Sequence, residues 1–209
     1  MRTIDHLSLA RHVMKFMKCE KRHRAAFLLG NIMPDFNPLS YFYPFDGNWF
    51  QGHSFRGKQK FISRRLSLKY RPAIFWWYLN GKAMHYLADA FTRPHHTEFG
   101  YTKESHAKYE ARLHDYFERR IKAEKLGLRV KVIPKEQRFL WILKLQEAYL
   151  KDNKDIAEDY DYITEAAAFA LGWLWEASGE KHPLFMRKHL RRASAAGYLP
   201  YPGMFGASK

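Results

Sequence analysis

Residues 85–110 read HYLADAFTRPHHTEFGYTKESHAKYE. This stretch contains two histidine–carboxylate pairs with a spacing of four residues, His85 with Asp89 and His106 with Glu110. On a helix, residues four apart lie one above the other on the same face, so each pair can bind one metal ion together. The stretch therefore predicts two helices that each present a histidine and an acid on one face.

The segment between the two pairs is expected to form a turn. Pro94 begins it, and two consecutive histidines follow, His95 and His96. The turn and the two helix faces together offer nitrogen and oxygen ligands of the kind that zinc takes. Asp89 also lies in a very apolar stretch, residues 72–92, where a charged side chain is costly unless it is paired or bound to a metal.

The whole chain has a predominantly helical pattern, because strand signals are almost absent. Only Leu128–Ile133 could form a short extended segment. The second helix is expected to end before Pro34, because the residue before a proline is pushed out of the helical region, and a long loop follows over residues 34–54. Helices are expected over about residues 5–18, 23–32, 54–68, 72–92, 102–126, 134–151, 155–178 and 182–196.

These elements predict an all-α fold, a single-domain multi-helix bundle that spans residues 1–209. Within it we distinguish a ligand-bearing part (residues 1–115), C-terminal helices (residues 134–196) and an irregular tail (residues 197–209). The helix over residues 72–92 is apolar almost all round, so we expect it to be the central buried helix.

The composition suits a protein with a sizeable core, because 46% of the 209 residues are hydrophobic and 17% are aromatic. No run approaches the ~18 uninterrupted apolar residues of a membrane span, and the N-terminus lacks the apolar segment of a signal peptide. The single Cys19 excludes an internal disulfide framework. We therefore expect a cytoplasmic protein.

The formal net charge is +15. Such a field attracts anions, including nucleic acid and an anionic membrane surface. The basic residues are dispersed along the chain, so a generally basic solvated surface explains the charge equally well. The charge informs on the class of partner and not on the chemistry.

Four further groups outside the central stretch are candidate metal ligands. His6 lies in the first predicted helical turn, Asp35 follows Pro34, and His53 lies at the far end of the long loop. The free amine and carbonyl of Met1 can form a five-membered chelate. Taken singly, His6, Asp35 and His53 are each better explained as an ordinary polar, turn or loop residue than as a metal ligand.

The combination of these motifs resembles the zinc-dependent phospholipase C and single-strand nuclease superfamily. The matching motifs occur in the order His6, Pro34-Asp35, His53, His85-Tyr86-Leu87-Ala88-Asp89, Pro94-His95 and His106-Ala107-Lys108-Tyr109-Glu110. The resemblance covers roughly residues 1–115 and implies an all-helical fold with a trinuclear zinc cluster, so we expect two or three zinc ions in this chain.

The resemblance also implies how the ligands are shared. One zinc ion would be bound by His53, His85 and Asp89, with Asp35 beside it. The second would be bound by the Met1 terminus, His6 and again Asp89, and the third by His95, His106 and Glu110. The family pattern usually has one histidine after the turn proline, and of the two present here we favour His95 over His96.

The same resemblance predicts a metal-dependent phosphodiester hydrolase, phospholipase C-like, in which Asp35 acts as the general base. Phe36 and Phe50 would line the substrate pocket, where they can hold a quaternary ammonium or stack a nucleobase. They fit equally well as core aromatics of the loop. The alternatives are a single-strand nuclease or 3′-nucleotidase, and a non-catalytic basic protein that binds lipid or nucleic acid and retains a degenerate metal site.

Overall fold

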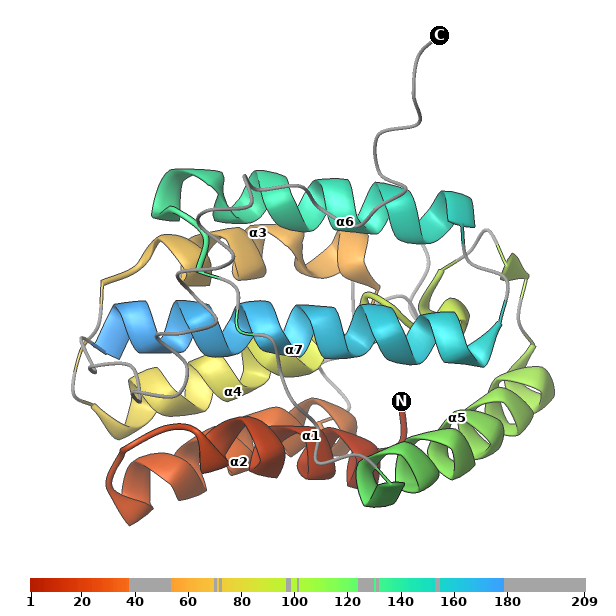
Figure 1. Cartoon of the computed structure of the whole chain (residues 1–209), viewed down its shortest axis with the longest axis horizontal. Helices are drawn as coiled ribbons and strands as arrows, with labels where there is room; N and C mark the ends of the chain where they lie inside the picture. Colours follow the sequence, from red (N-terminus) through yellow and green to blue (C-terminus); the bar gives the residue numbers. More distant parts are fainter. Residues whose placement is uncertain are drawn as a thin grey trace, which may run out of the picture.

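The computed structural model describes residues 1–37, 54–69, 71, 73–96, 99–100, 102–123, 130, 132–152 and 155–178. Within these residues the protein consists of seven α-helices and contains no strand (Figure 1). The predicted all-α fold class is therefore confirmed. None of the helices in this part of the chain is both long enough and apolar enough to cross a membrane.

The seven helices follow the order expected from the sequence. They are α1 (Thr3–Lys15), α2 (Lys21–Phe36), α3 (Phe55–Ser67), α4 (Ile74–Asp89), α5 (Lys103–Ala123), α6 (Arg138–Asp152) and α7 (Ile156–Ser178). Short 3₁₀ turns precede α5 and α6, at Arg93–His95 and Lys135–Gln137. Of the extended segment expected over residues 128–133, only residues 130, 132 and 133 are described, and they form no strand. The helix expected over residues 182–196 and the tail lie outside the described residues.

Helix α2 does not end where the sequence predicted. It continues through Pro34 to Phe36, so the expected end before Pro34 is wrong. A proline near the end of a helix removes only one hydrogen bond of the ladder, and the backbone N–H of Asn37 closes the last turn by donating to the carbonyl of Met33 at 3.1 Å. The additional helical turn carries Asp35.

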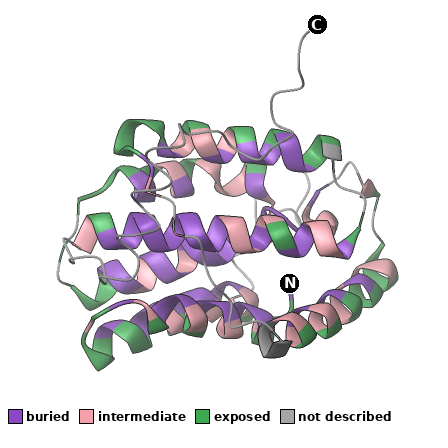
Figure 2. Ribbon diagram, in the orientation of Figure 1, coloured by how far each residue is buried: buried purple, intermediate pink, exposed green. Residues whose placement is uncertain are grey.

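The core of the bundle is centred on α7 and α4. Every residue of α7 from Ala166 to Trp175 is buried, and Figure 2 shows this burial along the middle of the helix. A helix that is apolar all round belongs at the centre of a bundle. The prediction that residues 72–92 form a buried helix agrees with the second half of α4, which is buried from Ala83 to Asp89, but Ile74 and Phe75 at the start of the helix are exposed.

Helices α2 and α4 run parallel and approach each other very closely. Gly81 of α4 lies against Phe27 of α2, and one turn further along both helices His85 bonds to the backbone of Asn31. A Cβ atom on Gly81 would lie 2.0 Å from the carbonyl oxygen of Phe27, and one on Gly30 would lie 1.9 Å from a backbone oxygen of α4. Only glycine permits this separation, which places the C-terminal turns of the two helices side by side.

Candidate metal centre

The candidate ligands come together where the ends of four helices and one turn meet. Eight of the nine predicted ligands lie in the described residues, and His53 does not. Their positions are Met1 before α1, His6 in α1, Asp35 in the last turn of α2, His85 and Asp89 in the last two turns of α4, His95 in the 3₁₀ turn, and His106 and Glu110 in the first two turns of α5.

The first group of ligand atoms combines α1, α2 and α4. Donor atoms of His6, Asp35 and His85 all lie within 4.8 Å of one another. The imidazole rings of His6 and His85 are stacked, with centroids 3.9 Å apart and an interplanar angle of 23°. Nε2 of His85 is 3.6 Å from Oδ1 of Asp35. We call these three residues the first ligand group.

The second group combines the 3₁₀ turn with α5. Donor atoms of His95, His106 and Glu110 also lie within 4.8 Å of one another. Nε2 of His106 is 3.2 Å from Oε1 of Glu110, as the spacing of four residues predicts. The rings of His95 and His106 meet edge to face, with centroids 5.5 Å apart. These three residues form the second ligand group.

Asp89 lies between the two groups and contacts both. Its Oδ1 atom is 3.0 Å from Nε2 of His6 and 3.5 Å from Nε2 of His95, and its Oδ2 atom is 3.1 Å from Nε2 of His85. The side chain is only 1% exposed. A single buried carboxylate therefore joins a helix-α1 histidine, a helix-α4 histidine and the histidine of the turn.

The amine of Met1 reaches the same place. It lies 3.0 Å from Oδ1 of Asp89 and 3.4 Å from Oε1 of Glu110, and Figure 1 shows the N-terminus beside α5. Burial lowers the pKa of this amine, but the negative charges of Asp89 and Glu110 outweigh burial and raise the pKa from 8.0 to about 10. The Met1 amine is thus held among carboxylates that belong to both α4 and α5.

The spacing of these donor atoms suits zinc. Two ligand atoms of a tetrahedral zinc ion, each about 2.0–2.1 Å from the metal, lie roughly 3.3 Å from each other. The observed separations between Asp89 and its three histidines run from 3.0 to 3.5 Å. Imidazole nitrogens and carboxylate oxygens are ligands that zinc accepts, so the residues present fit the metal.

The protonation states of the donors fit as well, because zinc binds neutral imidazole and ionised carboxylate. Burial, followed by the charge of His85, lowers the pKa of His6 to about 4. Burial opposes ionisation of Glu110, but its bond to His106 and the Met1 amine lower the pKa to about 2. Burial likewise opposes ionisation of Asp89, and the positive charges around it, His95 first, hold its pKa well below 3.8.

Two contacts that the sequence did not indicate orient the first ligand group. Nδ1 of His85 lies 2.8 Å from the carbonyl oxygen of Asn31. When Nδ1–H donates to that carbonyl, the lone pair of the neutral ring is on Nε2, which faces the acids. The hydroxyl of Thr3 donates to Oδ2 of Asp35 at 2.7 Å. Neither partner is recognisable from spacing, because one is a backbone carbonyl and the other an ordinary first-turn threonine.

A third contact ties α1 to α5. Oδ1 of Asp5, which is buried next to His6, lies 2.6 Å from Nδ1 of His114. The two helices that supply His6 and the pair His106–Glu110 are thereby linked. No local motif indicates this contact, because Asp5 and His114 are 109 residues apart in the sequence.

His96 belongs to neither ligand group. Its Nε2 atom lies 2.9 Å from the carbonyl oxygen of Ala90 and 3.2 Å from Nε2 of Gln146. Phe36, one of the two predicted pocket residues, is 66% exposed directly after Asp35. The other, Phe50, lies outside the described residues, as His53 does.

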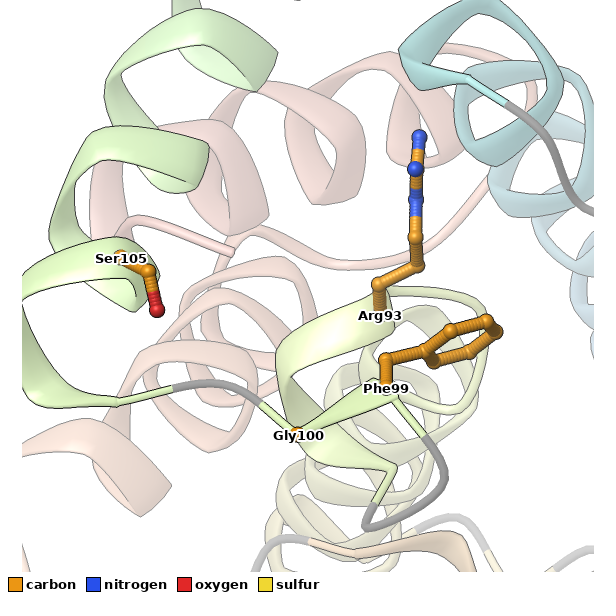
Figure 3. A pocket seen from close by; sticks show the side chains of 4 residues that line it. All are labelled: Arg93, Phe99, Gly100 and Ser105. Carbon is orange, nitrogen blue, oxygen red and sulfur yellow. The ribbon is translucent and has the colours of Figure 1, made fainter.

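A pocket of about 360 Å³ is lined by residues of the two segments that carry the second ligand group. It is lined by Arg93, Phe99, Gly100 and Ser105. Figure 3 shows Arg93 and Phe99 projecting from the segment after α4, with Ser105 on the facing first turn of α5. Arg93 precedes His95 by two residues, and Ser105 precedes His106 by one. Both walls of the pocket are therefore formed by segments that also carry proposed ligands.

Comparison with known proteins identifies the family. A family model described as zinc dependent phospholipase C matches residues 5–157, well over half of the chain. The matched range contains every candidate ligand except Met1 and continues beyond residue 115 through α6. No curated protein and no solved structure matches the chain. The helical fold, the two ligand groups and this match together place the chain in the zinc-dependent phospholipase C family.

Proposed function

We propose that this protein is a metal-dependent phosphodiester hydrolase that cleaves phospholipids in the manner of a phospholipase C. Membership of the family supports a zinc-dependent, phospholipase C-like role. The observation that carries the more specific proposal is the position of Asp89, whose buried carboxylate contacts histidines of both ligand groups. A buried carboxylate in this position could be shared as a ligand by adjacent metal ions.

The proposed centre holds two or three zinc ions. One would be held by His53, His85 and Asp89 with Asp35, a second by Met1, His6 and Asp89, and a third by His95, His106 and Glu110. The contacts of Asp89 with His6 and His85 support its sharing between the first two ions. The proximity of His95, His106 and Glu110 supports the third. The role of the Met1 amine applies to a chain whose terminus is Met1.

Zinc, when bound there, would supply Lewis acidity, which lowers the pKa of water and offsets the charge of a phosphoryl group. The protein's own contribution centres on Asp35. Thr3 donates to Oδ2 of this residue at 2.7 Å, which fixes the carboxylate and leaves Oδ1 directed toward His85. We propose that Asp35 orients the attacking water and accepts its proton, the role of a general base.

The substrate side of the site is proposed to be formed in part by Phe36. This ring follows the proposed base directly in sequence and is 66% exposed, so it is accessible to a ligand from solution. An aromatic face can hold a quaternary ammonium headgroup through a cation–π contact. Phe50 is proposed as a second aromatic contact on the evidence of the sequence alone.

A single-strand nuclease is the second candidate function. The observation that favours it is the formal net charge of +15, because a basic surface attracts the phosphate backbone of nucleic acid. A nuclease would use the same ligand groups and the same base, so the two functions differ only in substrate. A non-catalytic binding protein would keep its ligand affinity after the metal is removed.

The test combines metal content with turnover on untagged protein that begins at Met1. We expect two to three zinc ions per chain, and hydrolysis of p-nitrophenylphosphorylcholine that is lost on chelation and restored by zinc. Turnover of single-stranded DNA in place of the choline ester would favour the nuclease. A chain that binds no zinc and hydrolyses neither substrate would refute the proposed function.

The role of Asp35 is tested with a matched pair of substitutions. Asp35→Asn should abolish turnover while most of the zinc remains bound, because the amide cannot accept a proton. Asp115→Asn makes the same chemical change at an exposed position of α5 and should leave turnover unchanged. Undiminished turnover in Asp35→Asn would exclude this residue as the base.

A further inference from the structure

Asp159 forms the centre of a buried polar cluster. It lies in the first turn of α7, and its side chain is fully buried. Oδ2 accepts a hydrogen bond from the hydroxyl of Tyr109 at 2.6 Å and from Nε of Arg93 at 3.2 Å, and Oδ1 accepts one from the hydroxyl of Tyr149 at 2.8 Å. A buried carboxylate is costly unless it is paired and hydrogen-bonded, and here three donors satisfy it.

Two of these three donors belong to the elements that carry the second ligand group. Arg93 begins the 3₁₀ turn that contains His95, and Tyr109 directly precedes Glu110 in α5. The third donor, Tyr149, lies in α6, which supplies none of the predicted ligands. One carboxylate of α7 therefore connects the turn and the helix whose donor atoms must converge.

The charges in the cluster keep these bonds in place. Both phenols donate in these bonds, because an ionised carboxylate only accepts hydrogen bonds. The guanidinium of Arg93 lies 5.8 Å from the ring centroid of Tyr109, within the range of a cation–π contact. The arginine thus contacts both the carboxylate and the tyrosine that this carboxylate holds.

We infer that Asp159 is a positioning residue of the metal centre, which holds the His95 turn and helix α5 in the relative placement that brings His95, His106 and Glu110 together. The inference rests on the proposed function in assuming that these three residues bind zinc. Asp159 lies beyond the matched range of the family model, residues 5–157.

The physical reason lies in the geometry of the second ligand group. His95 and the pair His106–Glu110 come from separate elements, and the spacing of four residues fixes only the pair. The relative position of the turn and α5 has to be set by a contact outside the ligands, and Asp159 bonds to both. Loss of a residue that orients metal ligands typically costs roughly 10–100-fold in metal affinity.

The test measures the zinc affinity of each bound equivalent by competition with a chelator. Asp159→Asn replaces a carboxylate with an amide, whose nitrogen cannot accept a bond from a phenol or a guanidinium. We expect one zinc equivalent to weaken by roughly 10–100-fold, while the others keep their affinity. Asp161→Asn, the same change at an exposed position of the same helix, should alter none of them.

A second comparison assigns the weakened equivalent to the second ligand group. In protein that already carries His106→Ala, Asp159→Asn should have no further effect on the remaining zinc. An effect of unchanged size in that background would overturn the inference. So would a uniform weakening of all equivalents, which indicates a general loss of stability.

A matched tyrosine pair keeps the inference testable if Asp159→Asn does not fold. Tyr109→Phe and Tyr149→Phe each remove one hydroxyl that donates to Asp159, and both side chains are buried. Only Tyr109 lies on a ligand-bearing helix, so Tyr109→Phe should weaken one zinc equivalent several-fold and Tyr149→Phe should not. Equal effects of the two substitutions would refute the positioning role. Failure of the proposed function is distinguishable, because it is seen as absent hydrolysis by the unsubstituted protein, whereas the positioning role is measured by zinc affinity.

Discussion

The Nδ1 atom of His85 lies 2.8 Å from the carbonyl oxygen of Asn31. This contact crosses from α4 to α2, and it exists because the two helices approach closely at Gly30 and Gly81. The same approach brings Asp35, one turn beyond Asn31, to 3.6 Å from Nε2 of His85. The orientation of the histidine and the position of the proposed base thus depend on one helix–helix contact.

Gly81→Ala should separate α2 from α4 and damage the first ligand group. The added Cβ would meet the carbonyl oxygen of Phe27 at 2.0 Å, a backbone atom that can yield only if the helix moves. We expect a loss of at least about 1–3 kcal/mol in the free energy of unfolding, measured with urea, together with a loss of bound zinc. Ala25→Ser adds one atom on the exposed face of α2 and should leave bound zinc unchanged and cost no more than about 0.7 kcal/mol. A fully stable, zinc-replete Gly81→Ala protein would contradict the importance of this contact.

Asp89→Asn should be among the most destabilising single changes in the metal-free protein. It removes the counter-charge of the buried Met1 amine and a carboxylate oxygen that lies 3.0 Å from Nε2 of His6. Breaking a buried ion pair from one side typically costs about 3–5 kcal/mol. Urea unfolding of chelator-treated protein measures the loss, with Glu110→Gln as the comparison, because the Glu110 side chain is 24% exposed. A larger loss in Glu110→Gln would show that the centre is not organised around Asp89.

The substitutions His95→Ala and His96→Ala test which of the two adjacent histidines binds zinc. His95 faces Asp89 and His106, whereas Nε2 of His96 lies against the carbonyl of Ala90. We expect His95→Ala to lose about one zinc ion per chain. The His96→Ala protein should keep its zinc and lose stability, because the carbonyl of Ala90 loses a hydrogen-bond donor. Elemental analysis measures the zinc content of both variants, and thermal unfolding measures their stability. Loss of zinc in His96→Ala but not in His95→Ala would make His96 the ligand.

Removal of zinc should lower the melting temperature of the protein. A ligand that binds only the folded state stabilises it by about 4 kcal/mol when present at 1,000 times its dissociation constant. Chelation should therefore shift the calorimetric transition downward, and added zinc should restore it. Magnesium is the control ion. It should not restore the transition temperature, because it prefers oxygen ligands and the centre offers several imidazoles. Equal rescue by magnesium would argue against a histidine-based centre.

Lys58 should titrate near pH 8. Burial, and then the charge of Lys82, lower its pKa from 10.5 to about 8. The unfolded chain binds this proton more tightly than the folded chain, so the Lys58 contribution to stability increases as pH rises from 8 to 10.5. NMR of dimethylated lysines reports the pKa directly. Lys82→Gln should raise this pKa without restoring it fully, because burial is the larger cause, and an unchanged pKa would exclude coupling of the two amines.

The part of the metal centre that follows from the sequence is the part that depends on local spacing. His85 with Asp89 and His106 with Glu110 share helix faces because each pair is four residues apart, and both helices are present. The helical class of the described residues follows from the same periodicity. The end of α2 was misplaced because the rule for a residue before proline is statistical, and here a backbone hydrogen bond from Asn37 to Met33 closes one further turn beyond it.

Contacts between different helices could not be predicted from local spacing. The meeting of Asp89 with Met1 and His6 joins residues more than 80 positions apart, and no local pattern indicates it. The choice between His95 and His96 depends on which ring turns toward α5, and the role of Asp159 depends on which side chains reach the first turn of α7.

The sequence by itself determined the helices and the residue types that suit zinc, because helical periodicity and ligand chemistry are properties of short segments. Only the tertiary structure decided which helix ends meet around Asp89 and which carboxylates are buried there. That convergence depends on the close packing of α2 against α4 at two glycines, and on the anchoring of α5 to α1 and α7. Packing of this kind is set by the shapes of whole helix faces and not by the spacing of any motif.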